Sequence, residues 1–396
     1  MPEAVIVATG RTAIGRAGKG SFVDVRPDDL LGHAIKSVVE KSGIDKTDID
    51  DVIAGAVGTA NENVARAGGL LAGLPETVPG TTVNRYCSSS LQAIRMATHA
   101  IRSGEGDTYV ACGVEHSSGP PRPKEEEGGE GQQQRRPRRI GYGPHPKFWG
   151  DNAMWQLYIP MGLTAENVAE RFNVDRDDMD KFAQQSQERA VRAQKDGIFD
   201  KEILPYTKED GTVVSQDDGP RPGSTLDKLR SLPPAFKEGG KVTAGNSCPL
   251  NDGAAAVIVM SDEKAKALGL TPLARIVATA VSGLDPAIMG VGPIEAVKKV
   301  LARANMKIED IDVVELNEAF AAQVLPVCEA IGVDPFSDKL NPNGGAIALG
   351  HPFGMTGARI MTTLINDMQL LDRHFGIETM CVGGGQGMAM LVERLS

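Results

Sequence analysis

The chain has 396 residues, of which 41% are hydrophobic and 24% are charged, as in an average soluble globular protein. A formal net charge of -10 is opposite in sign to the basic footprint of nucleic-acid-binding proteins, so no nucleic-acid partner is predicted. The longest apolar stretches, such as residues 254–260, are too short to span a bilayer, and the first residues show no secretory signal pattern. A cytoplasmic protein with no membrane partner is therefore expected.

The cysteines are scattered along the chain, odd in number and without CxxC spacing. This pattern argues against a disulfide framework and against a zinc ribbon, so reduced thiols and no metal site are predicted. The five cysteines are Cys87, Cys112, Cys248, Cys328 and Cys381.

Strands and helices are predicted to alternate in the first part of the chain. Apolar runs of strand length alternate with amphipathic stretches that are closed by glycine, which is typical of an α/β protein with a largely parallel sheet. The predicted elements are a strand at 4–8, a helix at 28–41 before Gly43, a strand within 48–58, a strand at 81–83, a helix at 90–103 before Gly104 and a strand at 108–113.

The C-terminal third repeats this order. The acidic turn and strand of residues 309–319 resemble residues 48–58, and the strand predicted at 379–384 resembles that at 108–113. A helix predicted at 356–368 takes the place of the helix at 90–103. Several matches in the same order indicate an internal duplication, with two α/β halves related by a pseudo-twofold axis and with equivalent loops facing each other.

The region between the halves differs in composition. Residues 119–146 are rich in proline, glycine and charge and have almost no apolar side chains, so a mobile surface loop is predicted there. Residues 164–194 read as helical, with Asp175 as a candidate cap of a second helix. The α/β pattern resumes over residues 239–260.

Cys87 lies where a strand-like segment turns into a helix that begins at Ser88 or Ser89. A sulfur atom at a helix N-terminus meets the positive end of the macrodipole, which stabilises a thiolate and lowers its pKa. A reactive nucleophile and a packed cysteine at a helix cap fit this local sequence equally well.

His351 lies at a second elbow, between a glycine-rich approach and a helix that begins near Thr356. A lone histidine is usually structural, but the glycines and the proline around this one favour a role as a base. The duplication makes this elbow the counterpart of the Cys87 elbow. A cysteine and a histidine facing each other in this way can form an activated nucleophile.

Two further segments carry candidate functional groups. Residues 381–387 place Cys381 before a run of glycines whose backbone N–H groups could stabilise an oxyanion, although a phosphate loop is the rival interpretation. Asn317 follows a predicted buried strand at 313–316, where sites of α/β proteins often form. Taken alone, helix capping explains Asn317 better.

Together, Asn-x-x-Cys-x-Ser at 84–89, Asn-Glu-Ala-Phe at 317–320, Gly-His-Pro at 350–352 and Cys-x-Gly at 381–383 resemble the thiolase family. The similarity runs from Arg11 to Val382 and weakens over residues 117–157. This resemblance implies that Cys87 is the acylated nucleophile, that His351 takes its proton, and that Cys381 exchanges the α-proton of the acetyl-CoA unit. Asn317, through a water, and His351 would form one oxyanion hole, and the N–H groups of Cys87 and Gly383 the other.

The resemblance also implies a layered αβαβα fold, made of two duplicated halves and an inserted loop domain. The domains would be residues 1–118 plus 247–270, a loop domain at 119–246 that covers coenzyme A, and residues 271–396. Arg221 would lie near the adenine and Met161 in the acyl channel. Coenzyme A would be a substrate, no further cofactor is implied, and a homodimer or homotetramer is expected.

The expected activity is that of an acetyl-CoA C-acyltransferase, which cleaves or joins 3-ketoacyl-CoA thioesters. Residues 159–168 and 84–90 resemble degradative 3-ketoacyl-CoA thiolases of β-oxidation and fatty acid metabolism, whereas residues 340–359 also resemble thiolases acting on ketoadipyl-CoA. Biosynthetic acetoacetyl-CoA thiolases commonly have histidine where this chain has Pro160. At the usual serine contact to the coenzyme A arm this chain has Ser247 followed by Cys248, with Cys248 in the place of the serine.

Two other classes are weighed against a thiolase. A decarboxylating condensing enzyme of the same fold would normally lack the second catalytic cysteine, which is present as Cys381. A non-catalytic acyl-CoA binder should have lost at least one of the four catalytic candidates, and all four are retained: Cys87, Asn317, His351 and Cys381.

Overall fold

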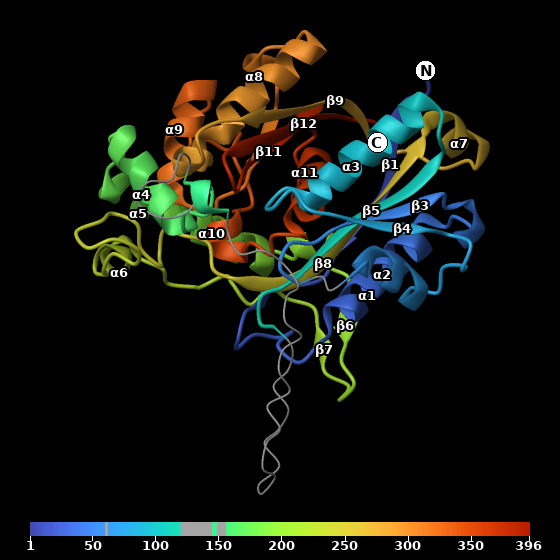
Figure 1. Ribbon diagram of the computed structural model, residues 1–396, viewed down its shortest axis with the longest axis horizontal. Helices are drawn as coiled ribbons and strands as arrows, with labels where there is room; N and C mark the ends of the chain where they lie inside the picture. Colours follow the sequence, from blue (N-terminus) through green and yellow to red (C-terminus); the bar gives the residue numbers. More distant parts are fainter. Residues whose placement is uncertain (60–61, 120–144, 149–155) are drawn as a thin grey trace, which may run out of the picture.

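The computed structural model describes residues 1–59, 62–119, 145–148 and 156–396 (Figure 1). Ten strands form one mixed sheet, and β6 and β7 form a separate small hairpin. The strands are β1 (Ala4–Arg11), β2 (Gly15–Arg16), β3 (Asp51–Gly55), β4 (Gly80–Val83), β5 (Thr108–His116), β6 (Tyr206–Thr207), β7 (Val213–Val214), β8 (Asn251–Ser261), β9 (Ala274–Gly283), β10 (Val313–Leu316), β11 (Phe375–Val382) and β12 (Gln386–Arg394).

The α-helices are α1 (Pro27–Ser42), α2 (Val64–Leu71), α3 (Ser89–Ser103), α4 (Met161–Arg171), α5 (Arg176–Lys195), α6 (Leu226–Arg230), α7 (Asp262–Ala267), α8 (Gly292–Ala304), α9 (Ala321–Ile331), α10 (Ala346–Leu349) and α11 (Thr356–Leu370). Short 3-10 turns are η1 (Lys46–Asp48), η2 (Pro146–Phe148), η3 (Ile198–Lys201), η4 (Pro286–Val291) and η5 (Ile308–Asp310).

The sheet has the same order on both sides of its centre. Its strands run β10-β11-β12-β9-β1-β8-β5-β3-β4, so β9, β12, β11 and β10 repeat the order of β1, β8, β5 and β3. The pairings repeat as well, because β3 is parallel to β5 as β10 is to β11, and β5 is antiparallel to β8 as β11 is to β12. Strands β1 and β9 join the two groups antiparallel at the centre. This order confirms the predicted duplication. The prediction of a largely parallel sheet is wrong, because most of the strand pairings are antiparallel.

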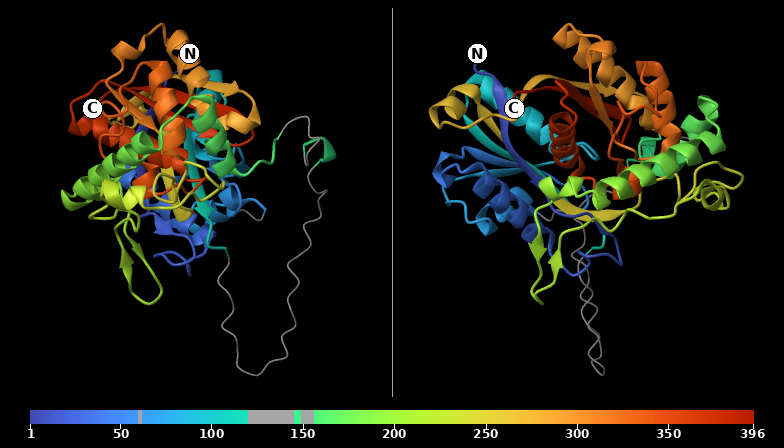
Figure 2. Two further views of the ribbon diagram at one scale, coloured as in Figure 1. Left: turned by 90° about the vertical axis from the view of Figure 1, so that its left-hand side faces the viewer. Right: turned by 180° about the vertical axis from the view of Figure 1, so that it is seen from behind.

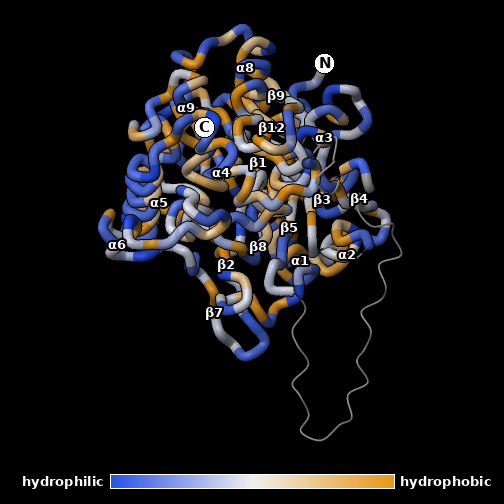
Figure 3. Tube along the Cα trace, turned by 60° about the vertical axis from the view of Figure 1, so that its left-hand side comes forward, coloured by the Kyte–Doolittle hydropathy of each residue, from blue (hydrophilic) through white to orange (hydrophobic). Residues whose placement is uncertain are grey.

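Helices cover the sheet in layers (Figures 1 and 2). Helices α1 and α2 pack on the strands of the first group, and α8 packs on the strands of the second. Helices α3 and α11 contact each other and lie between the two groups of strands (Figure 1). Apolar segments are concentrated along the inner strands, whereas the segments around α5 and α6 are largely hydrophilic (Figure 3).

Local sequence accounts for where several helices begin and end. Helix α1 begins with proline at its first position and ends at Gly43, which is left-handed with φ 72°. Helix α3 ends in the same way at Gly104, with φ 76°. Asp175 occupies the predicted cap position of α5, but its side chain makes no capping hydrogen bond. The strand predicted at 379–384 ends earlier, at Val382, because Gly384 and Gly385 have positive φ and turn the chain.

The central contact between α3 and α11 depends on glycine. A Cβ atom on Gly357 of α11 would lie 2.3 Å from the backbone nitrogen of Leu91 in α3. A Cβ on Gly113 of β5 would lie 2.0 Å from the carbonyl oxygen of Gly354, which precedes α11. Both distances are shorter than real carbon contacts, so the two halves approach here at backbone distance.

The proline- and charge-rich run at 119–146, predicted to be a mobile loop, lies almost wholly outside the described residues. Among the helices that the structure describes, none is long and apolar enough to cross a membrane.

Replacing Gly357 with alanine should therefore destabilise the protein. Its Cβ would meet backbone rather than a flexible side chain, and overpacking of this kind costs about 1–3 kcal/mol. Urea unfolding should show a lower midpoint for Gly357→Ala. Gly69→Ala in α2 is the matched control, because its Cβ would lie 3.6 Å from Leu74 and Val52, an ordinary contact. Equal midpoints for the two variants would contradict the close approach.

Candidate active site

The Cys87 elbow is built by a hydrogen-bonded turn between β4 and α3. Asn84 Oδ1 accepts the N–H of Tyr86 at 2.9 Å, and the hydroxyl of Ser89 donates to Tyr86 O at 2.6 Å. Tyr86 has a positive φ of 44°, unusual for a bulky residue, so the turn holds strained backbone directly before Cys87. Helix α3 begins two residues after Cys87, as predicted.

Burial dominates the chemistry of Cys87. The residue is 7% exposed, and desolvation raises the pKa of its thiol to about 11. The backbone N–H groups of Gly383 and of Cys87 itself approach the sulfur and oppose this effect. The expectation that the helix N-terminus lowers the pKa of Cys87 is therefore wrong, because loss of solvation outweighs these donors. At neutral pH the thiol is protonated and needs a base.

His351 lies at the opposite elbow, just before α11. Its backbone N–H donates to Asn251 Oδ1 at 3.0 Å, and its Nδ1 lies 2.7 Å from Thr356 Oγ1. The Thr356 hydroxyl donates its own proton to Pro352 O at 2.8 Å. Thr356 therefore accepts from His351, which puts the imidazole proton on Nδ1 and leaves the lone pair on Nε2.

The imidazole of His351 is neutral over the physiological pH range. Burial, and secondarily the positive charge of Arg359, lower the pKa of His351 to about 3. A neutral ring with its lone pair on Nε2 can accept a proton. Cys87 and His351 are thus both uncharged at rest, rather than a thiolate–imidazolium ion pair.

Asn317 lies beside His351, directly after β10. Its Nδ2 is 3.3 Å from His351 Nε2, and its backbone N–H donates to Thr379 O at 3.0 Å. Helix α9 begins only at Ala321, so the interpretation of Asn317 as a helix cap is wrong. Its buried Oδ1 has no hydrogen-bond partner among the described residues.

Cys381 is the last residue but one of β11, two residues before Gly383. It is 2% exposed, and burial raises the pKa of its thiol well above the usual range, with smaller contributions from Cys87 and Cys248. Gly383 lies against the elbow, since a Cβ there would be 3.2 Å from the Tyr86 ring. Asn317 and Cys381 line the same small cavity, which joins the Asn317–His351 pair to the thiols. Five predicted residues are thus brought together: Cys87, Asn317, His351, Cys381 and Gly383.

Arg221 and Ser247 line a cleft of about 310 Å³ together with Lys228. The Arg221 loop also borders a neighbouring cleft of about 390 Å³, which Arg192 and Lys195 line. The Ser247 hydroxyl donates to Thr243 O at 2.6 Å. Cys248 is half-buried and interacts electrostatically with Cys87, so it lies toward the catalytic thiols.

Met161 begins α4, where its side chain packs against the hydrophobic cluster that contains Phe320 and Cys381.

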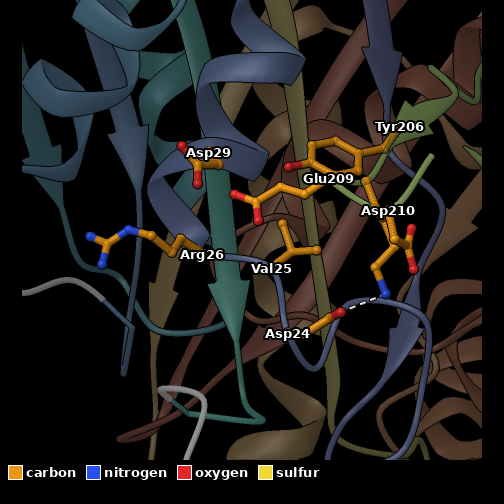
Figure 4. Close-up of a pocket in the computed structure, with 8 residues that line it drawn as sticks. Asp24, Val25, Arg26, Asp29, Tyr206, Glu209 and Asp210 are labelled. Carbon is orange, nitrogen blue, oxygen red and sulfur yellow. Dashed lines mark ion pairs between the residues drawn. The ribbon is translucent and has the colours of Figure 1, made fainter. Parts of the chain in front are cut away.

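A separate surface pocket of about 370 Å³ lies between the start of α1 and the β6–β7 hairpin (Figure 4). Carboxylates dominate its lining, and Lys208 pairs with Asp24 at 2.6 Å. Its residues are not those of the catalytic cluster, and in the described part of the chain no three or more His, Cys, Asp or Glu residues are grouped so that they could hold a metal ion.

Several supporting residues carry no motif in the sequence. Glu115 accepts hydrogen bonds from Gly58 N at 2.9 Å and from Gly354 N at 3.0 Å, which ties a loop of the first half to the His351 elbow. Thr356 fixes the tautomer of His351. Its position five residues after His351 is only a weak indication of this role in the sequence. Gln323 contacts Cys381. Its only sequence signal is the adjacent Asn-Glu-Ala-Phe segment.

Comparisons with known proteins agree on one family. Models of the thiolase N-terminal domain and of the thiolase C-terminal domain match residues 4–263 and 270–394. A 3-ketoacyl-CoA thiolase of Bacillus subtilis is 43% identical, with 99% of this chain and 100% of that protein covered. A 3-oxoadipyl-CoA/3-oxo-5,6-dehydrosuberyl-CoA thiolase of Escherichia coli is 44% identical, with 100% of both chains covered.

The crystal structure of an acetyl-CoA acetyltransferase of Bacillus anthracis superposes with a TM-score of 0.88 at 39% identity. The match covers 100% of this chain and 99% of that one. This likeness confirms the predicted fold class.

The raised pKa of Cys87 predicts how its alkylation by iodoacetamide depends on pH. A thiol with a pKa of about 11 gains thiolate as pH rises, so the rate at Cys87 should climb steadily from neutral pH to about pH 10. Peptide-resolved mass spectrometry at several pH values measures it, with Cys87→Ala to assign the peptide. A plateau below neutral pH would reveal a thiolate–imidazolium pair and contradict this account.

Proposed function

We infer that this chain, which belongs to the thiolase family, is an acetyl-CoA C-acyltransferase that cleaves or forms 3-ketoacyl-CoA thioesters through an acyl group on Cys87. The observation that carries the proposal is the convergence of two buried thiols, an uncharged imidazole and an amide on one site. Covalent catalysis by a thiol needs a base to remove its proton, and C–C cleavage at a carbonyl needs an acid for the carbanion formed.

In the thiolytic direction, His351 Nε2 takes the proton of Cys87, and the sulfur attacks the 3-keto carbonyl. The bond between the α- and β-carbons then breaks. The acyl group stays on Cys87, and the electron pair of the broken bond leaves with the α-carbon as the enolate of acetyl-CoA. Cys381 gives its proton to that carbanion. The thiol of free coenzyme A then gives its proton to the Cys381 thiolate and attacks the acyl-Cys87 thioester. The Cys87 sulfur leaves and takes back the proton that His351 holds, which restores the resting enzyme and gives ping-pong kinetics.

Two sets of donors stabilise the negative oxygens. The N–H groups of Cys87 and Gly383 already approach the Cys87 sulfur, where the tetrahedral oxyanion would form. For the enolate, we propose His351 and a water held by Asn317. The buried Asn317 Oδ1, without a partner among the described residues, supports a bound water, since such acceptors are normally satisfied.

Coenzyme A is proposed to lie in the cleft lined by Arg221, Lys228 and Ser247. The adjoining cleft adds Arg192 and Lys195, so basic groups border both sides of the Arg221 loop, as phosphate binding requires. Met161 is proposed for the acyl channel. Because Ser247 donates to backbone, Cys248 is proposed as the contact to the coenzyme A arm.

The substrate is proposed to be that of a degradative 3-ketoacyl-CoA thiolase, with acetoacetyl-CoA and 3-oxoadipyl-CoA as the alternatives. Relatives named 3-ketoacyl-CoA thiolase, acetyl-CoA acetyltransferase and 3-oxoadipyl-CoA/3-oxo-5,6-dehydrosuberyl-CoA thiolase are about equally similar, at 43%, 43% and 44% identity. We also propose a homodimer or homotetramer, no cofactor beyond coenzyme A as substrate, and a division into residues 1–118 plus 247–270, 119–246 and 271–396. The rates on acetoacetyl-CoA, a longer 3-ketoacyl-CoA and 3-oxoadipyl-CoA would decide between the acyl chains.

Replacing Cys87 with alanine should abolish thiolysis. Loss of a nucleophile that acts as part of a unit costs at least about a thousandfold in kcat. Cys381→Ala should lose α-proton exchange of acetyl-CoA by about 10²–10⁴-fold but still form acyl-Cys87, because general acid–base catalysis contributes that much. Cys328→Ala is the control, a buried thiol among the apolar side chains of the core. Undiminished thiolysis in Cys87→Ala would refute the nucleophile.

Replacing Arg221 with alanine should raise KM for coenzyme A by about tenfold and leave kcat within about twofold, as expected for the loss of one hydrogen bond to a charged group. Steady-state thiolysis at varied coenzyme A measures both constants. Arg230→Ala is the matched control, because that guanidinium pairs with Asp177 on α5. An unchanged KM in Arg221→Ala would remove Arg221 from the binding site.

A further inference from the structure

Gln323 contacts the catalytic thiol Cys381 directly. The Cys381 thiol donates to Gln323 Oε1 at 3.5 Å, a distance suited to sulfur. Gln323 lies in the first turn of α9, is 3% exposed, and donates its backbone N–H to Phe320 O at 3.0 Å. Cys381 must lose and regain its proton, and the buried amide of Gln323 is in direct contact with the sulfur that carries it.

Packing fixes the stem of Gln323 but leaves the end of its amide weakly held. A Cβ on Gly290 of η4 would lie 2.2 to 2.4 Å from Gln323 Cγ, Cδ and Nε2, so glycine is needed to make room for this side chain. Among the described residues the Nε2 group donates only to Met289 Sδ, at 3.8 Å, and a thioether is a weak acceptor. Reversing the amide would therefore cost little.

The two protonation states of Cys381 have opposite needs. A buried thiol requires an acceptor for its S–H, whereas a buried thiolate requires a donor. A primary amide offers a carbonyl oxygen and an NH₂ group at one end, and its terminal torsion is broad and nearly two-fold. The surroundings of Cys87 are different, because its sulfur is approached by backbone N–H groups, which are fixed donors.

We propose that Gln323 is a positioning residue for the α-proton transfer, with its amide accepting from the Cys381 thiol and reversing to donate to the Cys381 thiolate. This inference rests on the proposed function, in which the proton passes between the α-carbon and the Cys381 sulfur. The amide itself neither gains nor loses a proton. Its reversal trades the weak contact to Met289 for a hydrogen bond to a charged sulfur.

The test separates proton exchange from acylation. Gln323→Met keeps the volume of the side chain but removes the amide, so deuterium exchange into acetyl-CoA should fall about 10- to 100-fold, as for a lost hydrogen bond to a charged group. Acylation of Cys87, followed by mass spectrometry, should stay within about twofold. Gln323→Glu places a carboxylate beside the thiolate, so its exchange profile should move to higher pH by about one unit.

Gly290→Ala should reproduce the selective loss, since the new Cβ displaces Gln323 rather than backbone. Gln185→Leu is the control, because it removes an amide that donates to Pro335 O at 3.2 Å rather than to a catalytic thiol. Wild-type exchange in Gln323→Met, or an equal loss of exchange and acylation, would overturn the inference. Cys381→Ala is measured in parallel. Normal exchange in Cys381→Ala would overturn the proposed role of Cys381 and this inference with it. Lost exchange in Cys381→Ala would support the role of Cys381, and the result for Gln323→Met then tests the role of Gln323 alone.

Discussion

The active site depends on one packing constraint, the approach of α3 and α11 to backbone distance. Gly357 leaves no room for a Cβ at this contact, and the Ser90 hydroxyl accepts the N–H of Ala358 across it at 2.9 Å. Gly113 of β5 likewise leaves no room for a Cβ against Gly354, just before α11. The elbows that carry Cys87 and His351 precede these two helices directly. Helix α3 packs on the first group of strands and α11 packs on strands of both groups, so the thiol and the imidazole can meet only if both halves are folded and docked.

Docking at this distance also removes water, and burial then sets the charge states. The pKa of Cys87 rises and that of His351 falls, so both groups rest uncharged. Arg359, buried in α11, adds a positive charge on the side of His351, which further disfavours imidazolium. A resting ion pair would have to be desolvated at a cost of several kcal/mol per ion. The neutral pair avoids that cost and forms charge only when substrate provides an oxyanion to be stabilised.

Sequence patterns predicted most of the fold, because strand and helix periodicity is a local property. Strand β10 and helices α1, α3 and α11 lie at or within two residues of their predicted positions. The duplication was visible for the same reason, since each half repeats its own local order. The predicted strand at 379–384 extends too far at its end, because the positive φ of Gly384 turns the chain there.

What the sequence could not supply are effects that arise only from packing between distant segments. The predicted low pKa of Cys87 used a helix N-terminus, a local feature, whereas burial, which raises this pKa, is a property of the folded chain. The interpretation of Asn317 as a helix cap is wrong for a similar reason, because its partner His351 lies in another segment of the fold. Glu115 and Gln323 have no motif of their own, and their roles follow from partners that only the docked halves provide.

The two catalytic thiols show how burial alone does not assign a role. Cys87 and Cys381 are both buried and both have raised pKa values, so desolvation treats them alike. Their nearest polar groups differ. Fixed backbone N–H groups surround the Cys87 sulfur, which suits a site where negative charge always develops on the same atoms. Cys381 instead meets a side-chain amide that can present either a donor or an acceptor, which suits a sulfur that must alternate between thiol and thiolate. The nucleophile and the proton carrier therefore differ in how rigid their hydrogen-bond partners are, although both thiols are buried.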